Sequence, residues 1–90
     1  MVQVIVDPQE MLEFVRALKA FNSQTIELHG RIDSRFKKLS ETWRDVDQKK
    51  FADEFAQTTK NLQNFVRFSE AHIPVLTKKA QHLLDAQNQR

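Results

Sequence analysis

Three histidines are the first candidates for chemistry in this sequence, because no cysteine is present to act as a thiolate ligand or to form a disulfide. His72 and His82 are ten residues apart, a spacing that does not place them on one face of a helix, and His29 belongs to a different segment. The three do not follow the spacing of the helical zinc-binding motif. We therefore expect no metal site and no cofactor.

The carboxylates and hydroxyls show no catalytic pattern. Asp53 and Glu54 lie among Lys49, Lys50 and Gln57, which is typical of a solvated, ion-pairing helix face. No serine or threonine has a histidine and an acid at a spacing that indicates an activated nucleophile. A pair of catalytic acids also needs a concave pocket, which a thin helical chain does not provide. We expect no catalytic residues and no enzymatic activity.

The basic residues form three short clusters, at positions 35–38, 49–50 and 78–79. The first two could form a positive rim with Arg44, but Glu41, Asp45 and Asp47 lie among them. The net charge is only +2, and recognition of nucleic acid needs a denser one-sided stripe with stacking groups. A small, basic, dimeric nucleic-acid-binding protein is therefore the alternative function, and nucleic acid is not the expected partner.

The composition indicates one all-α domain. The chain has 90 residues, with one glycine, two prolines, 29% charged residues and 40% apolar residues. This mixture suits long helices and leaves little material for the turns of a β fold. No stretch approaches the roughly 18 apolar residues of a membrane span, and the N-terminus lacks the pattern of a cleaved signal peptide. We expect a cytoplasmic protein, or one secreted without a cleaved leader.

The order of elements in the single domain, residues 1–90, follows from start and stop signals. An extended arm is predicted at residues 1–7, and Asp7 and Pro8 then provide a cap and a first helical residue. A helix is predicted at 8–41, a turn at 42–46, and a second helix at 47–86. Asp45 and Gln48 form a second capping signature, and Pro74 predicts a kink in the second helix.

An apolar stripe along each helix predicts that the two helices pack against each other. The members alternate in spacing between three and four residues, as a seam between packed helices requires. With a turn of a few residues, the result is an antiparallel two-helix hairpin. The predicted seam consists of Met11, Phe14, Leu18, Phe21, Thr25, Leu28, Ile32, Phe36 and Leu39, followed by Phe51, Phe55, Thr58, Leu62, Phe65, Ser69, Ile73, Leu76, Ala80 and Leu83.

A two-helix hairpin leaves one side of its seam open, so we expect a partner. Apolar residues outside the predicted seam form a patch toward the open end of the hairpin, which predicts an interaction surface. The simplest arrangement is a dimer of two hairpins, giving a four-helix bundle. The alternative is a monomer in which the arm at residues 2–6 folds back over the patch. The predicted interface residues are Leu12, Val15, Trp43, Phe68, Ala71 and Val75.

Trp43, the only tryptophan, lies at the predicted turn. Tryptophan is rigid, amphipathic and enriched at binding hot spots, so Trp43 could anchor a partner. It could equally close the end of its own hairpin. Both roles stay open, and they are compatible with each other.

These residues resemble the Trp-x-Gly superfamily, the small helical-hairpin proteins of the early-secreted-antigen type. The resemblance rests on Leu39, Trp43, Phe51 and Phe55, followed by Leu62, Phe65 and a long helical tail, and it covers nearly the whole chain. It implies homodimers or heterodimers with a similar hairpin that form four-helix bundles. It also implies an association with type VII secretion as a secreted partner, an adaptor or a chaperone-like subunit, with secretion machinery or a larger toxin as further partners.

Two features depart from the family pattern. Asp45 stands where the family has glycine, and a capping Asp can also start the following helix. The family's export signal places a tyrosine before an acid near the end of the second helix, but this chain has no tyrosine. The resemblance therefore predicts the fold more firmly than it predicts export.

Overall fold

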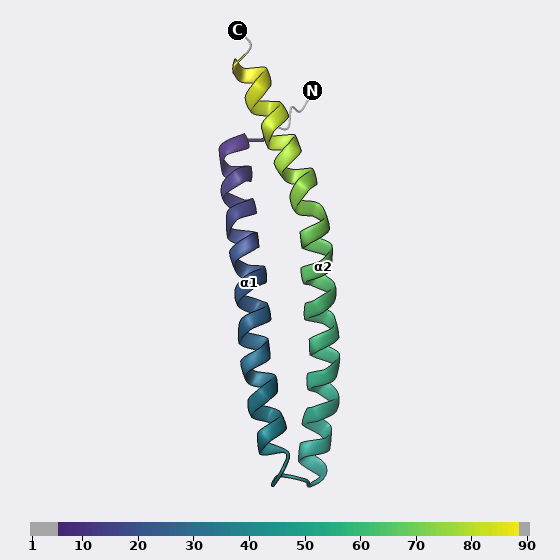
Figure 1. Ribbon diagram of the computed structural model, residues 1–90. Coiled ribbons are helices and arrows are strands. Elements are labelled where there is room, and N and C mark those ends of the chain that lie inside the picture. Colours follow the sequence, from purple (N-terminus) through teal and green to yellow (C-terminus); the bar gives the residue numbers. More distant parts are fainter. Residues whose placement is uncertain (1–5, 89–90) are drawn as a thin grey trace.

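The computed structural model describes residues 6–88, which form two long antiparallel helices (Figure 1). Helix α1 spans Pro8–Leu39 and helix α2 spans Val46–Asn88, and residues 6–88 contain no strand. The predicted all-α helical hairpin is confirmed. The predicted N-terminal arm lies outside the described residues, except for positions 6 and 7.

Asp7 starts α1 as the sequence predicts. Its side chain accepts hydrogen bonds from the backbone N–H groups of Gln9, at 2.9 Å, and Glu10, at 3.4 Å. Pro8 follows at the first helical position, where its missing N–H is not needed. The helix ends at Leu39, two residues before the predicted end, where the Ser40 hydroxyl donates to the Phe36 carbonyl at 2.8 Å. Both ends of α1 are thus closed by side chains of the sequence itself.

The turn between the helices needs no glycine. The Trp43 N–H donates to the Leu39 carbonyl at 2.9 Å, and the Gln48 N–H donates to the Asp45 carboxylate at 3.0 Å, which caps α2. No residue in the range 6–88 has a positive φ angle. Asp45 can therefore replace a glycine here, because this turn demands no left-handed backbone and does demand an acceptor for the first N–H groups of α2.

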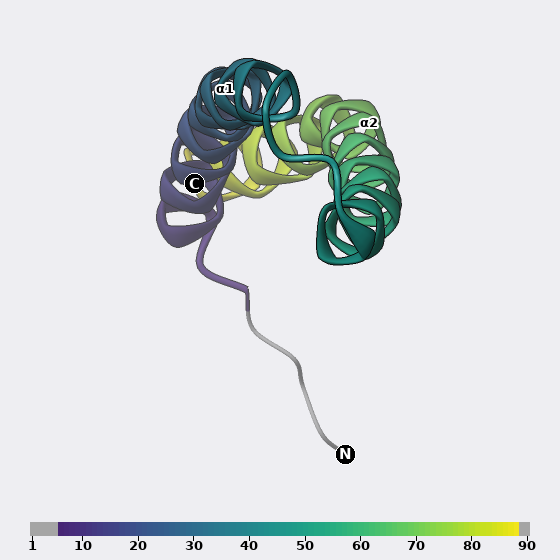
Figure 2. The same cartoon turned by 90° about the horizontal axis from the view of Figure 1, so that it is seen from below.

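Helix α2, with 43 residues against 32 in α1, continues without a break through Pro74. Its C-terminal third leans over toward α1 and extends past the start of that helix (Figure 1). Proline removes one backbone hydrogen bond, which commonly bends a helix, and the Thr77 hydroxyl donates to the Ile73 carbonyl at 2.8 Å beside it. Viewed along the long axis, the two helices wind about each other (Figure 2).

The contact between the helices keeps some α1 residues of the predicted seam, such as Thr25 and Phe36, but is shifted by part of a turn around α1. We call the side chains that lie between the helices the contact seam. Its buried members are Pro8, Val15, Asn22, Val66, Ser69 and Ala80, and its half-buried members include Thr25, His29, Phe36, Phe55, Thr59 and Leu62. The predicted seam placed Phe14, Phe21 and Leu28 between the helices, but they are 48–58% exposed. That part of the prediction is wrong, because the next residues along the helix, Val15, Asn22 and His29, face α2 instead.

The molecule is thin. Its principal dimensions are 68 × 28 × 16 Å and its radius of gyration is 20.0 Å. Apart from Pro8, only three apolar residues of the described chain, Val15, Val66 and Ala80, are buried. A helix with its side chains is about 10–12 Å in diameter, so the hairpin is little more than one helix thick and cannot enclose a core of its own.

Candidate functional site: an exposed phenylalanine face

Large apolar side chains form a continuous row on one side of the hairpin. We call this row the phenylalanine face. On α1 its members are spaced mainly by seven residues, which keeps them on one side of the helix. Each is between 44% and 60% exposed. The members are Phe14, Phe21, Leu28, Ile32 and Leu39 on α1, and Phe51, Phe65 and Phe68 on α2.

Aromatic contacts show that the two helices contribute to the same face. The rings of Phe21 and Phe65 meet edge to face with centroids 5.8 Å apart, and both remain about half exposed. Nearer the turn, Phe51 packs against Phe36 at 5.2 Å. The row therefore bridges α1 and α2, and it extends along most of the hairpin.

The residues predicted to form the interface lie in three different environments. Val15 is only 4% exposed in the contact seam, so its predicted place in an open patch is wrong. Leu12 and Trp43 are half-buried, and Trp43 packs edge to face on Phe36 with centroids 6.5 Å apart. Phe68 and Val75 are each 60% exposed and Ala71 is also exposed, so these three are accessible on α2. Their role in binding stays a prediction.

The sequence prediction missed most members of the phenylalanine face as binding residues. It assigned Phe14, Phe21, Leu28, Ile32 and Leu39 to the contact between the helices. The periodic signal that identified them was correct. It could not reveal which of two adjacent stripes faces α2, because that depends on contacts between residues about 30 to 50 positions apart.

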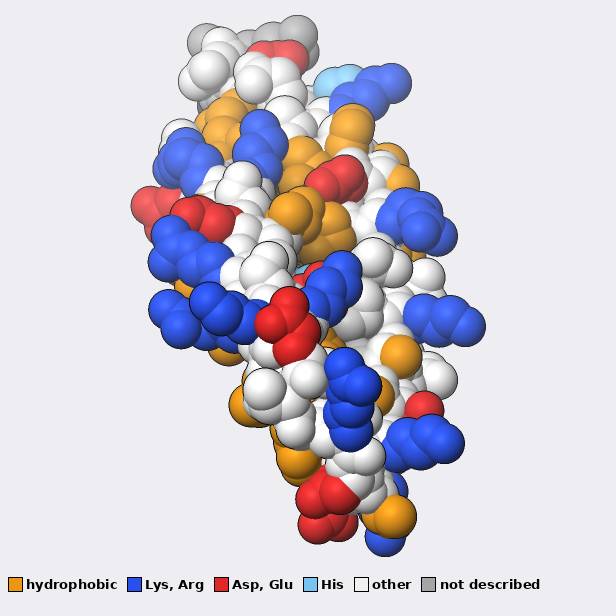
Figure 3. All heavy atoms as spheres, turned by 60° about the horizontal axis from the view of Figure 1, so that its bottom comes forward, with side chains coloured by type: hydrophobic (Ala, Val, Ile, Leu, Met, Phe, Trp, Pro, Cys, Tyr) orange, Lys and Arg blue, Asp and Glu red, His pale blue; other side chains and the backbone are white. Residues whose placement is uncertain are grey.

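Figure 3 shows a face on which Lys and Arg side chains line both flanks, with Asp and Glu interspersed and hydrophobic side chains gathered between the helices. Two ion pairs follow α1, Arg31 with Glu27 at 2.7 Å and Lys37 with Asp33 at 3.0 Å. Both are i, i+4 pairs with exposed partners, so each adds only a few tenths of a kcal/mol, roughly, to helix stability. The charges solvate this surface rather than concentrating one sign on it.

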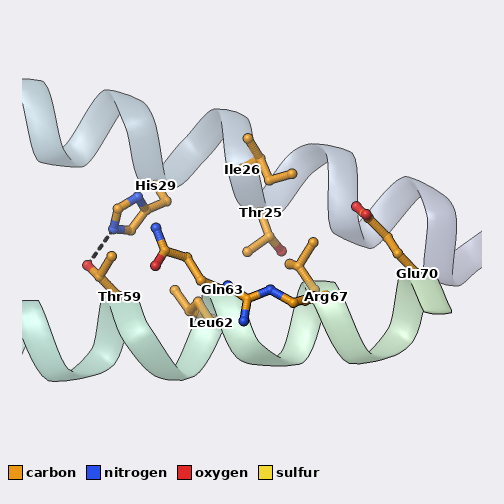
Figure 4. Close-up of a pocket in the computed structure, with 9 residues that line it drawn as sticks. Thr25, Ile26, His29, Thr59, Leu62, Gln63, Arg67 and Glu70 are labelled. Atoms are coloured by element: carbon orange, nitrogen blue, oxygen red, sulfur yellow. Dashed lines mark hydrogen bonds between the residues drawn. The ribbon is translucent and has the colours of Figure 1, made fainter. Parts of the chain in front are cut away.

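A shallow groove lies between the helices on the side that carries Ile26 and Gln63 (Figure 4). His29 and Thr59 are joined across it by a hydrogen bond of 2.7 Å, and Arg67 and Glu70 lie along α2 at its border. No group of three or more His, Asp or Glu side chains in residues 6–88 is placed to share a metal ion.

The sequence matches, over residues 3–88, the profile of a family described as proteins of 100 residues with WXG. The chain belongs to this family. The only tryptophan is followed by Arg44 and Asp45, and the sequence Trp43-Arg44-Asp45 has an aspartate where a Trp-x-Gly motif has glycine. Asp45 caps α2 through the Gln48 N–H.

Solved structures with the same fold include a secreted protein, EsxB, from Bacillus anthracis strain Sterne. The TM-score is 0.72 with 20% sequence identity, over 98% of this chain and 100% of the other. A mutant of that secreted protein gives a TM-score of 0.72 with 19% identity, over 98% of each chain. At this level of identity the similarity establishes the helical-hairpin fold. A comparison with curated protein sequences gives no match.

Neither helix within residues 6–88 combines the length and the apolar character that a membrane span requires.

Proposed function

We propose that this protein is a non-enzymatic interaction module in which the phenylalanine face binds a similar helical hairpin, a second copy of the same chain, to form a four-helix bundle. The proposal rests on the side of α1 that faces α2. Two stripes of residues run along α1, displaced from each other by one residue, which corresponds to about 100° around the helix. One stripe, at Val15 and Asn22, faces α2, and the other, at Phe14 and Phe21, faces outward.

This arrangement is typical of a helix with two neighbours. In an isolated pair, the middle of the apolar sector would face the other helix and bury the largest side chains. In a four-helix bundle, each helix contacts one neighbour within the hairpin and another across it, so the sector is shared between two directions. Helix α1 divides its apolar sector in this way, because one stripe contacts α2 and the other is exposed. The eight side chains of the phenylalanine face are 44–60% exposed as a result.

The charges bordering the face favour a second copy as the occupant. On α1, Glu10 lies one turn before Phe14, and Arg35 lies between Ile32 and Leu39 at the other end. On α2, the order is reversed along the molecule, with Glu54 beside Phe51 near the turn and Lys79 toward the open end. Two copies packed face to face in opposite directions, with α1 opposite α1 and α2 opposite α2, bring Glu10 toward Arg35 and Glu54 toward Lys79 of the other copy. These four charges favour self-association, although Lys49 and Lys50 also border Phe51.

The length of the phenylalanine face agrees with a second hairpin as the partner. Burial of apolar surface stabilises association by about 25 cal/mol per Å² before the entropy of association is subtracted. A second hairpin of equal length can cover the row from Phe14 to Leu39 along its whole extent, which a short peptide cannot do.

Sedimentation equilibrium tests the proposal. The wild-type chain should sediment as a dimer at micromolar concentration, and Leu28→Asp should be a 10.6 kDa monomer with unchanged helix content, because Leu28 is 55% exposed and contributes to the face alone. Ser34→Asp, which places the same charge at an exposed position outside the face, is the matched control and should remain dimeric. A wild-type chain that stays monomeric, or a Leu28→Asp chain that stays dimeric, would overturn the proposal.

We also propose that the module serves type VII secretion, as a secreted partner, adaptor or chaperone-like subunit. Membership in the family and the fold shared with a secreted protein support this role. The chain has no tyrosine to form the export signal of the family, so we expect export to require a second chain that carries one. Co-expression with a secretion system, with and without a tyrosine-bearing partner hairpin, tests this by measuring the protein in the medium. Export of the chain alone would contradict the requirement.

A further inference from the structure

The contact seam presents a physical puzzle. At the level of Asn22 and Ser69, the helices bury a polar pair and leave two adjacent phenylalanines partly in solvent. Asn22 and Ser69 are each only 3% exposed, whereas Phe21 and Phe65, which lie beside them, are 48% and 44% exposed. Apolar burial alone would favour the opposite choice, because it is roughly proportional to the apolar area removed from water.

Hydrogen bonds across the contact seam favour the observed arrangement over one in which Phe21 and Phe65 lie between the helices. The Asn22 side-chain amide donates to the Ser69 hydroxyl at 2.7 Å, and that hydroxyl donates to the Val66 carbonyl at 3.0 Å. One level nearer the turn, His29 and Thr59 are joined at 2.7 Å. At the turn itself, the Gln48 side-chain amide donates to the Ser40 hydroxyl at 3.0 Å. These three cross-helix bonds form a polar ladder along the described hairpin.

The ladder can form in only one rotation of the helices. Turning α1 by about a quarter turn would bring Phe21 into the seam and carry Asn22 away from Ser69, since successive residues lie 100° apart. The arrangement with Phe21 in the seam requires only a small movement, because Phe21 and Phe65 already touch at the edge of the seam. It would turn the α1 members of the phenylalanine face toward α2 and remove them from the surface.

The ladder is not optimised for the stability of the isolated hairpin. The Asn22 side-chain oxygen is buried and has no hydrogen-bond partner among residues 6–88. A buried polar group that is only partly paired destabilises the fold relative to an apolar side chain that fills the same space. A polar residue retained at such a position commonly specifies one arrangement at the expense of stability.

We propose that the polar ladder, and the Asn22–Ser69 pair above all, fixes the rotation of the helices so that the phenylalanine face points outward before any partner arrives. Asn22 and Ser69 are thus positioning residues for the binding face, although neither touches the partner. This inference rests on the proposed function, because the face it positions is the one that binds the second copy. It makes the hairpin preorganised for association.

The experiment removes the ladder without adding apolar bulk. The double variant Asn22→Ala, Ser69→Ala abolishes the central pair, and the reciprocal swap Asn22→Ser, Ser69→Asn rebuilds it with the partners exchanged. Ser23→Ala, at an exposed position next to Asn22, is the control. Each chain carries fluorinated phenylalanine, so that a soluble paramagnetic quencher reports the accessibility of the rings by fluorine NMR. The ring measurement is made at a chain concentration at which sedimentation equilibrium finds only monomers. A charge on the phenylalanine face is avoided here, because it would itself resist turning inward.

The alanine pair should stay helical while its phenylalanine rings become less accessible to the quencher than those of the parent, because the rows turn inward. At higher concentration, the alanine pair should self-associate at least about tenfold more weakly than the wild-type chain, which corresponds to about 1.4 kcal/mol. The swap should restore both properties, and Ser23→Ala should change neither.

Equal or greater ring accessibility in the alanine pair would overturn the inference, and so would its unfolding, because the pair would then only stabilise the hairpin. The ring measurement uses monomers, so it decides the inference even if the wild-type chain does not dimerise. Failure of the proposed function would appear separately, as a monomeric wild-type chain in sedimentation.

Discussion

The contact seam and the phenylalanine face lie side by side on the same helices, and they differ in how far they combine residue types. The seam mixes apolar side chains such as Val15 and Val66 with small or polar ones such as Ala80, Ser69 and Asn22, while the face is wholly apolar and exposes five of the seven phenylalanines of the chain. Small side chains let the two helices approach closely, and polar ones specify how they align. Large apolar side chains are left for a second contact. The difference indicates that the hairpin is one half of an apolar core.

The largest expected effect is a loss of hairpin stability on placing a carboxylate in the contact seam, compared with placing one on the phenylalanine face. Val66 is 8% exposed in the seam, so Val66→Asp buries a carboxylate with no partner, which costs about 3–5 kcal/mol. We expect circular dichroism at 25 °C to show loss of most helix signal. Leu28→Asp places the same charge on the face and should retain the signal. Equal helix loss in both variants would break the distinction between seam and face.

Trp43 tests whether the turn belongs to the seam. It is half-buried against Phe36, so Trp43→Ala should destabilise the hairpin by about 2 kcal/mol, less than a fully buried aromatic residue would. Urea unfolding of the monomeric Leu28→Asp background measures this change. Glu41→Ala, at an exposed position in the same turn, is the control. A change below about 0.5 kcal/mol would mean that Trp43 serves the partner alone.

Asp45 tests the start of α2, where no contact of either region is involved. Asp45→Ala removes the acceptor of the Gln48 N–H and should destabilise the hairpin by about 1 kcal/mol. Thermal unfolding compares it with Asp53→Ala, an exposed acid inside the helix. If the two variants unfold at the same temperature, the cap does not account for the loss of the family's glycine.

A substitution at Gly30 should have the smallest effect on hairpin stability, and it should stabilise the hairpin, whereas the earlier variants destabilise it. A methyl group at this position meets no atom within 4 Å, so Gly30→Ala should stabilise the hairpin by about 0.5–1 kcal/mol through helix propensity alone. Dimerisation should be unchanged, because Gly30 belongs to neither the seam nor the face. Reduced dimerisation in Gly30→Ala would show that the binding surface extends farther around α1.

Local signals in the sequence were sufficient to predict both helices, the caps at Asp7 and Asp45, the turn at Trp43 and a second helix that continues past Pro74. Each depends on residues within a few positions of one another. The rotation of the helices could not be predicted in this way. Asn22 and Ser69 are 47 residues apart, and nothing in the local pattern around either one identifies the other as its partner. Periodicity therefore located a broad apolar sector but not the edge that each contact uses.

The elongated shape has a practical consequence for any measurement of mass. A compact domain of 90 residues would have a radius of gyration of about 12 Å, whereas this hairpin has 20.0 Å. Such a rod experiences more friction in solution than a sphere of equal mass, and it elutes early from a gel-filtration column. A single hairpin will therefore elute like a larger globular protein, and light scattering or sedimentation equilibrium is needed to count the chains.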